Sequence, residues 1–126
     1  MILVIGGAYS GKLDFVKNTY NIKEEDIYFC KDDTLDFSKS VISGFHKFTY
    51  ECILKGINPL EVLNKNMDNL KDKIIICDEI SSGIVPLKKE ERLWREDTGR
   101  CLQALSKNSQ KVYRVFCGIP TLIKGE

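Results

Sequence analysis

The sequence is poor in the residue patterns that define several protein classes. Its 126 residues contain one histidine, one tryptophan and three prolines. The five cysteines are odd in number and none forms a C-x-x-C pair, which argues against a zinc site and against a disulfide framework. Neither sign of charge dominates, because 19 basic and 18 acidic side chains leave a net charge of +1. No overall field therefore draws the chain to nucleic acid or to an anionic membrane surface.

Long hydrophobic runs are also missing. The apolar stretch at residues 2–5 is far too short to span a bilayer, and no basic segment precedes it, so we predict neither a membrane span nor a secretory signal. Reduced cysteines in apolar stretches suit a cytoplasmic protein. Hydrophobic residues make up 43% of the sequence, enough for a packed core. The length predicts one domain over residues 1–126.

Apolar patterning predicts alternating strands and helices. Short β-branched or apolar runs predict strands at 26–30, 74–77 and 112–117 besides 2–5, and the sequence allows a short edge strand at 122–124. Helices are predicted at 12–18, from Ser38 to a C-cap at Gly56, from Pro59 onward, and at 90–107 with Leu93 among its inward residues. The second of these rests on the helical spacing of Val41, Phe45, Phe48 and Cys52. This alternation predicts an α/β fold with a mostly parallel sheet and helices on both faces.

The sharpest motif follows the first strand and opens the first helix. It is a match to G-x-x-x-x-G-K, formed by Gly6, Gly7, Ala8, Tyr9, Ser10, Gly11 and Lys12. Such a loop wraps main-chain N–H groups around phosphates, and its lysine reaches the β- and γ-phosphates. We therefore predict nucleotide binding by residues 6–13 in a P-loop fold. The alternative is a glycine-rich turn with a chance lysine.

Two further positions concern the metal that accompanies a nucleotide. Leu13 stands where the motif has the Ser or Thr that binds Mg²⁺, so carboxylates and water must hold the ion or catalysis is weak. The buried strand at 74–77 ends in Asp78 and Glu79. An aspartate there can hold Mg²⁺ and a neighbouring glutamate can orient a nucleophile. We predict Lys12, Asp78 and Glu79 as catalytic residues and Asp78 as the metal ligand.

The sequence resembles the adenosylcobinamide kinase / adenosylcobinamide-phosphate guanylyltransferase family. The resemblance covers residues 1–17 and 73–124. It rests on the phosphate loop, on the segment from Glu79 to Pro86 containing G-I-V-P, on an R-x-x-R run at Arg92 and Arg95, and on Gly118-Ile119-Pro120. Asp78 and Ser81 stand where the family has Asn and Gly. The family's aspartate-bearing central strand has no counterpart, so we expect Asp78 to take over its acidic role.

The resemblance implies phosphorylation of the aminopropanol hydroxyl of adenosylcobinamide with ATP or GTP and Mg²⁺, followed by transfer of GMP from GTP through a covalent histidine. His46 is the sole histidine and hence the candidate guanylyl carrier; the alternative is a half-buried histidine beside the apolar stripe of its helix. Arg92 and Arg95 are implied substrate-binding residues, with a solvated face paired to neighbouring glutamates as the alternative. Family members are trimers, so a homo-oligomer is expected.

Two other functions stay open. One is a P-loop kinase for another small hydroxylated substrate. The other is a nucleotide-binding protein of the same fold that has lost catalysis, which Leu13 and the short middle of the chain favour. The C-terminal motifs favour the cobinamide kinase.

Overall fold

The structure, a computed structural model, describes residues 1–80 and 88–126. The described residues contain one six-stranded sheet in the order β2-β3-β4-β1-β5-β6. Its strands are β1 Ile2–Gly6, β2 Ile27–Phe29, β3 Val41–Ser43, β4 Ile74–Asp78, β5 Lys111–Phe116 and β6 Ile119–Lys124. The helices are α1 Lys12–Tyr20, α2 Phe45–Leu54, α3 Pro59–Lys65 and α4 Lys89–Asn108, with 3₁₀ turns at Glu24–Asp26 and Met67–Leu70.

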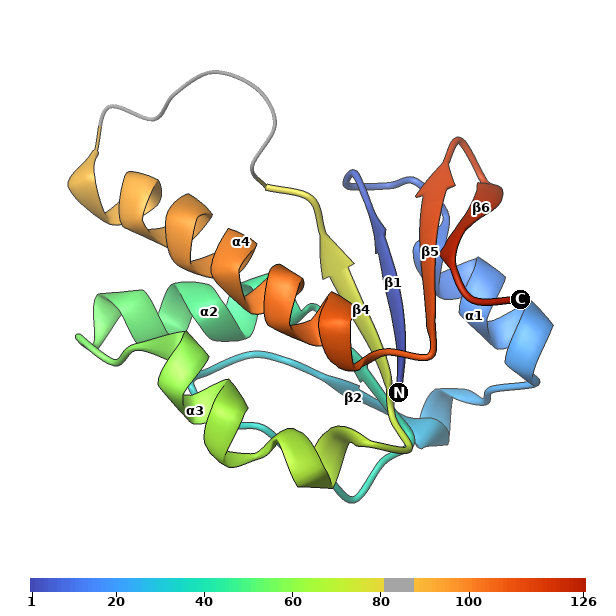
Figure 1. Ribbon diagram of the computed structural model, residues 1–126, viewed down its shortest axis with the longest axis horizontal. Helices are drawn as coiled ribbons and strands as arrows, with labels where there is room; N and C mark the ends of the chain where they lie inside the picture. Colours follow the sequence, from blue (N-terminus) through green and yellow to red (C-terminus); the bar gives the residue numbers. More distant parts are fainter. Residues whose placement is uncertain (81–87) are drawn as a thin grey trace.

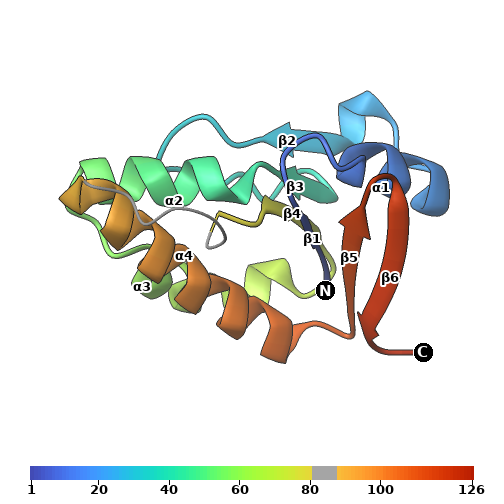
Figure 2. The same ribbon diagram turned by 90° about the horizontal axis from the view of Figure 1, so that it is seen from above.

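All strand pairs are parallel except β5 with β6. Helices α2, α3 and α4 cover one face of the sheet and α1 covers the other (Figures 1 and 2). Side chains along β4 alternate between the two layers: Ile75 and Cys77 pack in the core beneath α2–α4, whereas Ile74 and Ile76 pack with α1. The predicted α/β fold, with a mostly parallel sheet covered on both faces, is confirmed.

The predicted helix from Ser38 to a C-cap at Gly56 is wrong in its first seven residues. Val41–Ser43 is a strand, fully buried between β2 and β4, and α2 begins only at Phe45. Val41 packs on the α1 side of the sheet, whereas Phe45 lies in the opposite layer, so the helical spacing between them is coincidental. A short buried run cannot be assigned by periodicity alone. Gly44, at φ 76°, makes the turn from β3 into α2.

The C-terminal strands β5 and β6 form a hairpin. The sequence predicted the first of these strands, at 112–117, but only the end of the second, at 122–124. Cys117 and Gly118 are the two-residue loop of the hairpin, and both have positive φ, at 50° and 77°, as a type I′ turn requires. The edge strand therefore begins at Ile119 rather than at residue 122. Pro120 is tolerated because edge strands can leave an N–H position unpaired.

The end of α2 and the start of α3 lie close to where the sequence places them. The Asn58 side chain accepts a hydrogen bond from the Leu60 N–H at 3.0 Å, with Pro59 at the first helical position, as predicted. Gly56, at φ 71°, follows the end of α2 where a helix stop was expected. In α4, Leu93 is 40% exposed, so its predicted inward position is wrong.

Gly99 lies within α4, where the sequence suggests close approach of another backbone or of a ligand. A Cβ at Gly99 would meet no atom of the described residues within 4 Å, so no other described backbone approaches it, and approach of a ligand stays a prediction. We expect Gly99→Ala to raise the free energy of unfolding by about 1 kcal/mol, because alanine has the higher helix propensity and the space is open. Urea unfolding followed by circular dichroism measures the change. An unchanged or lowered midpoint would contradict this account of Gly99.

All five cysteines are free thiols, and four of them are buried. Burial raises the pKa of the Cys30 thiol to about 12, so it behaves as an apolar side chain at neutral pH. Among the described residues, no helix combines the length and the apolar character needed to cross a membrane.

Candidate active site

The carboxyl ends of three neighbouring parallel strands form one edge of the sheet. β1 ends at Gly6 and continues into the phosphate loop, β3 ends at Ser43, and β4 ends at Asp78. The register pairs Gly6 with Asp78 directly, and the Gly44 N–H donates to the Ile76 carbonyl at 3.0 Å. Ligands of open α/β sheets bind at this edge. A cavity of about 500 Å³ lies here.

The phosphate loop lines this cavity from Ala8 to Leu13. Gly11 has φ 90°, which places the N–H groups of the following residues at the start of α1. The Phe15 N–H already donates to the Gly11 carbonyl at 3.0 Å, so helical bonding begins in the loop. A helix N-terminus carries partial positive charge and attracts phosphate. The loop thus lies between β1 and the start of α1, where the sequence places it, and its binding of a nucleotide stays a prediction.

The loop is braced by the strand and turn behind it. A Cβ at Gly6 would lie 2.4 Å from the Val115 carbonyl oxygen and 2.7 Å from the Ser10 Oγ, so only glycine fits. The Gly118 N–H donates to the Ser10 carbonyl at 2.7 Å. The β5–β6 turn therefore supports the phosphate loop from outside the cavity.

Lys12 is only 7% exposed, and its ammonium group is held at three points. Nζ lies 2.7 Å from the Gly7 carbonyl oxygen, 3.4 Å from the Ser10 Oγ and 2.7 Å from Asp78 Oδ1. The structure therefore brings together two of the predicted catalytic residues, which are 66 positions apart in the chain.

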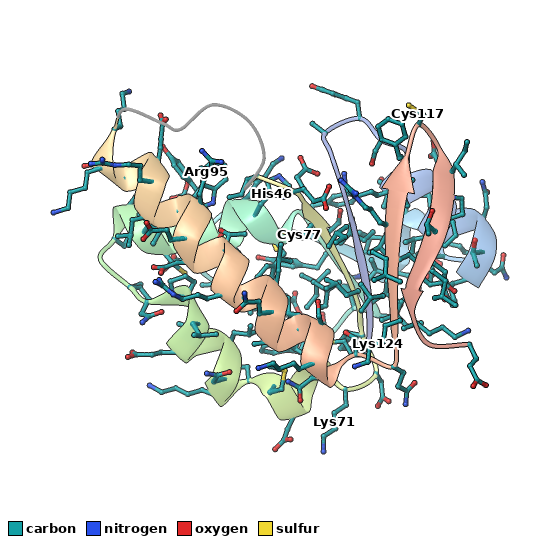
Figure 3. All side chains as sticks on the ribbon, turned by 45° about the horizontal axis from the view of Figure 1, so that its top comes forward. His46, Lys71, Cys77, Arg95, Cys117 and Lys124 are labelled. Atoms are coloured by element: carbon teal, nitrogen blue, oxygen red, sulfur yellow. The ribbon has the colours of Figure 1, made fainter. Side chains whose placement is uncertain are left out.

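His46 also contacts Asp78, through both of its ring nitrogens. The Asp78 main-chain N–H donates to His46 Nδ1 at 3.1 Å, and His46 Nε2 lies 3.4 Å from Asp78 Oδ2. Because Nδ1 accepts a hydrogen bond, the neutral ring carries its proton on Nε2, where it faces the carboxylate. His46 stands at the first turn of α2, on the cavity side (Figure 3).

The pKa of His46 is lowered, mainly because burial disfavours the imidazolium. Lys47 and Lys12 lower it further, and the Asp78 carboxylate opposes the shift. The unfolded chain therefore takes up this proton at a higher pH than the folded one does. The contribution of His46 to stability is complete above the unfolded pKa of about 6.5 and is lost as the pH falls below it.

We expect the free energy of unfolding of the wild type to fall more between pH 7.5 and pH 5 than that of His46→Asn, whose side-chain oxygen can still accept the Asp78 N–H. Urea titrations at both pH values measure the two differences. Groups that titrate alike in both proteins cancel in the comparison. Equal losses in the two proteins would contradict the assignment of His46 as a neutral, buried ring.

The remaining predicted site residues lie elsewhere. The Glu79 carboxylate does not line the cavity; Arg114 holds it, with Nη2 to Oε2 at 3.2 Å. Arg92 is exposed on α4 and Arg95 is partly buried one turn along. Figure 3 shows Arg95 at the same end of the molecule as His46. The G-I-V-P segment and Ser81 lie outside the described residues.

Sequence reasoning missed the part of the cavity that β3 and α2 contribute. Ser43, Gly44 and Lys47 line it, together with Phe29 and Cys30 at the end of β2. The missed signal is Gly44, which comes two positions after the β-branched pair Val41-Ile42 and interrupts the helical pattern that we assigned across it.

Asp78 is a carboxylate that lines the cavity beside the loop, where it could hold a divalent metal. Its carboxylate is the ligand type that Mg²⁺ prefers, whereas Leu13 offers no ligand. The described part of the chain contains no group of three His, Cys, Asp or Glu side chains that could hold a metal unaided. The residues therefore fit an ion that arrives with a nucleotide and takes its other ligands from phosphate oxygens and water.

Comparison with known proteins agrees with this geometry. The family model for cobinamide kinase / cobinamide phosphate guanyltransferase matches residues 55–123, more than half of the chain. The matched range contains β4, α4 and the β5–β6 hairpin, and the phosphate loop precedes it. A search of the curated proteins gives no match. The chain thus belongs to the cobinamide kinase / cobinamide phosphate guanyltransferase family, and it is a transferase of cobalamin biosynthesis.

Proposed function

We propose that this chain is a kinase that phosphorylates the aminopropanol hydroxyl of adenosylcobinamide, with ATP or GTP as the donor. The observation that carries the proposal is the contact between Lys12 and Asp78, 2.7 Å apart, in a cavity bounded by the phosphate loop. Phosphoryl transfer requires mainly positioning and stabilisation of charge. The loop amides, an ammonium group and a carboxylate are the groups that supply both.

Lys12 exchanges partners when a nucleotide binds. In the structure its charge is neutralised by Asp78 Oδ1, and the loop carbonyl of Gly7 holds it in place. The β- and γ-phosphates of a bound nucleotide replace the carboxylate as the partner of Lys12, which frees Asp78. The ammonium then stabilises the negative charge on the transferring phosphoryl group.

Mg²⁺ is the cofactor that the freed carboxylate suits. Asp78 would hold the ion, directly or through water, and the bound ion would supply neutralisation of charge on the β- and γ-phosphates. The two oxygens of Asp78 then face different groups: Oδ1 lies on the side of Lys12, and Oδ2 faces His46. His46 positions Asp78 by accepting its main-chain N–H.

The guanylyl-transfer step has less support. A histidine that carries GMP needs an unshared electron pair on one ring nitrogen. Here Nδ1 accepts the Asp78 N–H, and Nε2 carries the proton that faces the carboxylate. This arrangement suits a positioning residue better than a nucleophile, so we assign the kinase step alone. Trimer formation and contacts from Arg92 and Arg95 stay predictions of the family resemblance.

Product analysis tests the proposal. The purified chain is incubated with Mg²⁺, adenosylcobinamide and either ATP or GTP, and the corrinoid and the protein are both analysed by mass spectrometry. We expect a corrinoid that has gained one phosphoryl group and no GMP on His46. Nucleotide binding without a phosphorylated corrinoid would favour the protein that has lost catalysis, for which the absence of a hydroxyl at Leu13 is the supporting observation.

A further inference from the structure

A second cavity, of about 420 Å³, lies beside the nucleotide cavity, between α2 and α4. Tyr50 and Glu51 of α2 line it, as do Glu91 and Trp94 of α4. We propose that this cavity is the acceptor site, which binds an amide-rich macrocyclic alcohol with the aromatic pair Tyr50–Trp94 as its apolar wall. This inference rests on the proposed kinase function and adds the location of its second substrate.

Shared residues connect the two cavities. His46 and Lys47, adjacent in the first turn of α2, line both of them. His46 Nε2 in turn lies 3.4 Å from Asp78 Oδ2, so His46 joins this oxygen to the second cavity. A hydroxyl that enters from between α2 and α4 therefore meets Asp78 at Oδ2, whereas Lys12 contacts Oδ1.

The wall of the second cavity is a fixed aromatic surface. The rings of Tyr50 and Trp94 meet edge to face, with centroids 5.0 Å apart. The Trp94 indole N–H donates to the His46 carbonyl at 2.9 Å and to Thr49 Oγ1 at 3.0 Å. Both aromatic rings are thus tied to the turn that carries His46. A rigid aromatic surface with few rotatable bonds is suited to packing against a large ring system.

The charges of the second cavity select against a polyanion. Lys31 and Lys47 balance Glu51 and Glu91 among the residues that line it. Lysine and glutamate side chains together offer hydrogen-bond donors and acceptors, which matches carboxamide groups. A second nucleotide would find no surplus of positive charge here. The acceptor, whose amides are uncharged, fits better.

In the transfer step, the acceptor oxygen forms a bond to the γ-phosphorus while the bond between that phosphorus and the β–γ bridging oxygen breaks. The nucleoside diphosphate leaves with the electron pair of the broken bond. The hydroxyl proton passes to Asp78 Oδ2 and exchanges from there with water. Lys12 and the loop amides stay with the phosphates throughout.

Steady-state kinetics with Tyr50→Ala tests this site. With nucleotide saturating, we expect the KM for cobinamide to rise about tenfold, since truncating a central aromatic contact has an effect of that order, while the KM for the nucleotide stays unchanged. Tyr50→Phe keeps the ring and should restore the wild-type KM. Leu54→Ala is the matched control, because Leu54 is on the same helix, is 52% exposed and lines neither cavity.

Equilibrium dialysis with cobinamide, on the same proteins, separates this inference from the kinase proposal. If the wild type binds cobinamide without phosphorylating it, the kinase proposal fails, and weaker binding by Tyr50→Ala still supports the site. If the wild type phosphorylates cobinamide and Tyr50→Ala has the same KM, the site is wrong and the kinase stands. If cobinamide is neither bound nor phosphorylated, both are contradicted.

Discussion

Replacing Lys12 by alanine should lower the rate of phosphoryl transfer by about 100- to 1,000-fold, the range found when one preorganised donor to a transition-state anion is removed. Lys12 is almost fully buried, and the Gly7 carbonyl holds its ammonium beside the loop before any nucleotide arrives. The phosphates replace Asp78 as its partner on binding, so the ammonium is in place before the moment of transfer. The effect should appear in kcat and also in nucleotide affinity, because the same charge binds the phosphates in the ground state.

Lys17→Ala is the matched control for this experiment. Lys17 lies on the same helix and pairs with Glu24 on the surface, where an ion pair contributes little. It lines neither of the two cavities. We expect its kcat and nucleotide KM to match those of the wild type. A Lys12→Ala protein that is folded and retains wild-type turnover would show that the loop does not act on the transferring group.

The second large effect is expected for Asp78→Asn, which keeps the shape of the side chain and removes its charge. We expect kcat to fall about 100-fold or more and nucleotide affinity to lose its dependence on Mg²⁺, because the carboxylate is both the metal ligand and the acceptor of the hydroxyl proton in this account. Titration of a fluorescent nucleotide, with and without Mg²⁺, measures the affinity, and initial rates measure kcat.

Asp33→Asn provides an unusually close control. Asp33 and Asp78 have side chains that are 24% and 25% exposed, and each forms an ion pair with a lysine at 2.7 Å. The pair of Asp33 with Lys55 lies outside both cavities. Losing an ion pair of this kind is therefore common to both variants, and only Asp78→Asn should lose Mg²⁺-dependent affinity. Equal effects of the two substitutions would mean that Asp78 acts through folding rather than chemistry.

The phosphate loop and the acidic strand end could be predicted because local sequence determines them. Gly6, Gly11 and Lys12 occupy fixed places in a motif whose backbone needs positive φ and close approach. Asp78 follows a run of three isoleucines and a cysteine. Such a run is typical of a buried strand, and the structure has one there. Parallel pairing then brings Asp78 beside Gly6.

The remainder of the site depends on contacts that sequence spacing does not reveal. The strand at Val41–Ser43 is only three residues long, and its apolar side chains continue a helical spacing by coincidence. Missing it hid the contribution of Gly44 and Lys47 to the cavity. The contact of His46 with Asp78 joins a helix to a neighbouring strand, and the pairing of Glu79 with Arg114 crosses the end of β1. Such contacts follow from tertiary packing alone.

The most direct test of the central claim is transfer of a labelled γ-phosphate from ATP or GTP to cobinamide, measured side by side for the wild type, Asp33→Asn and Asp78→Asn. The account predicts labelled cobinamide phosphate at equal rates with the wild type and Asp33→Asn, and about 100-fold less with Asp78→Asn. Nucleotide that binds to the wild type without any label reaching cobinamide would contradict it.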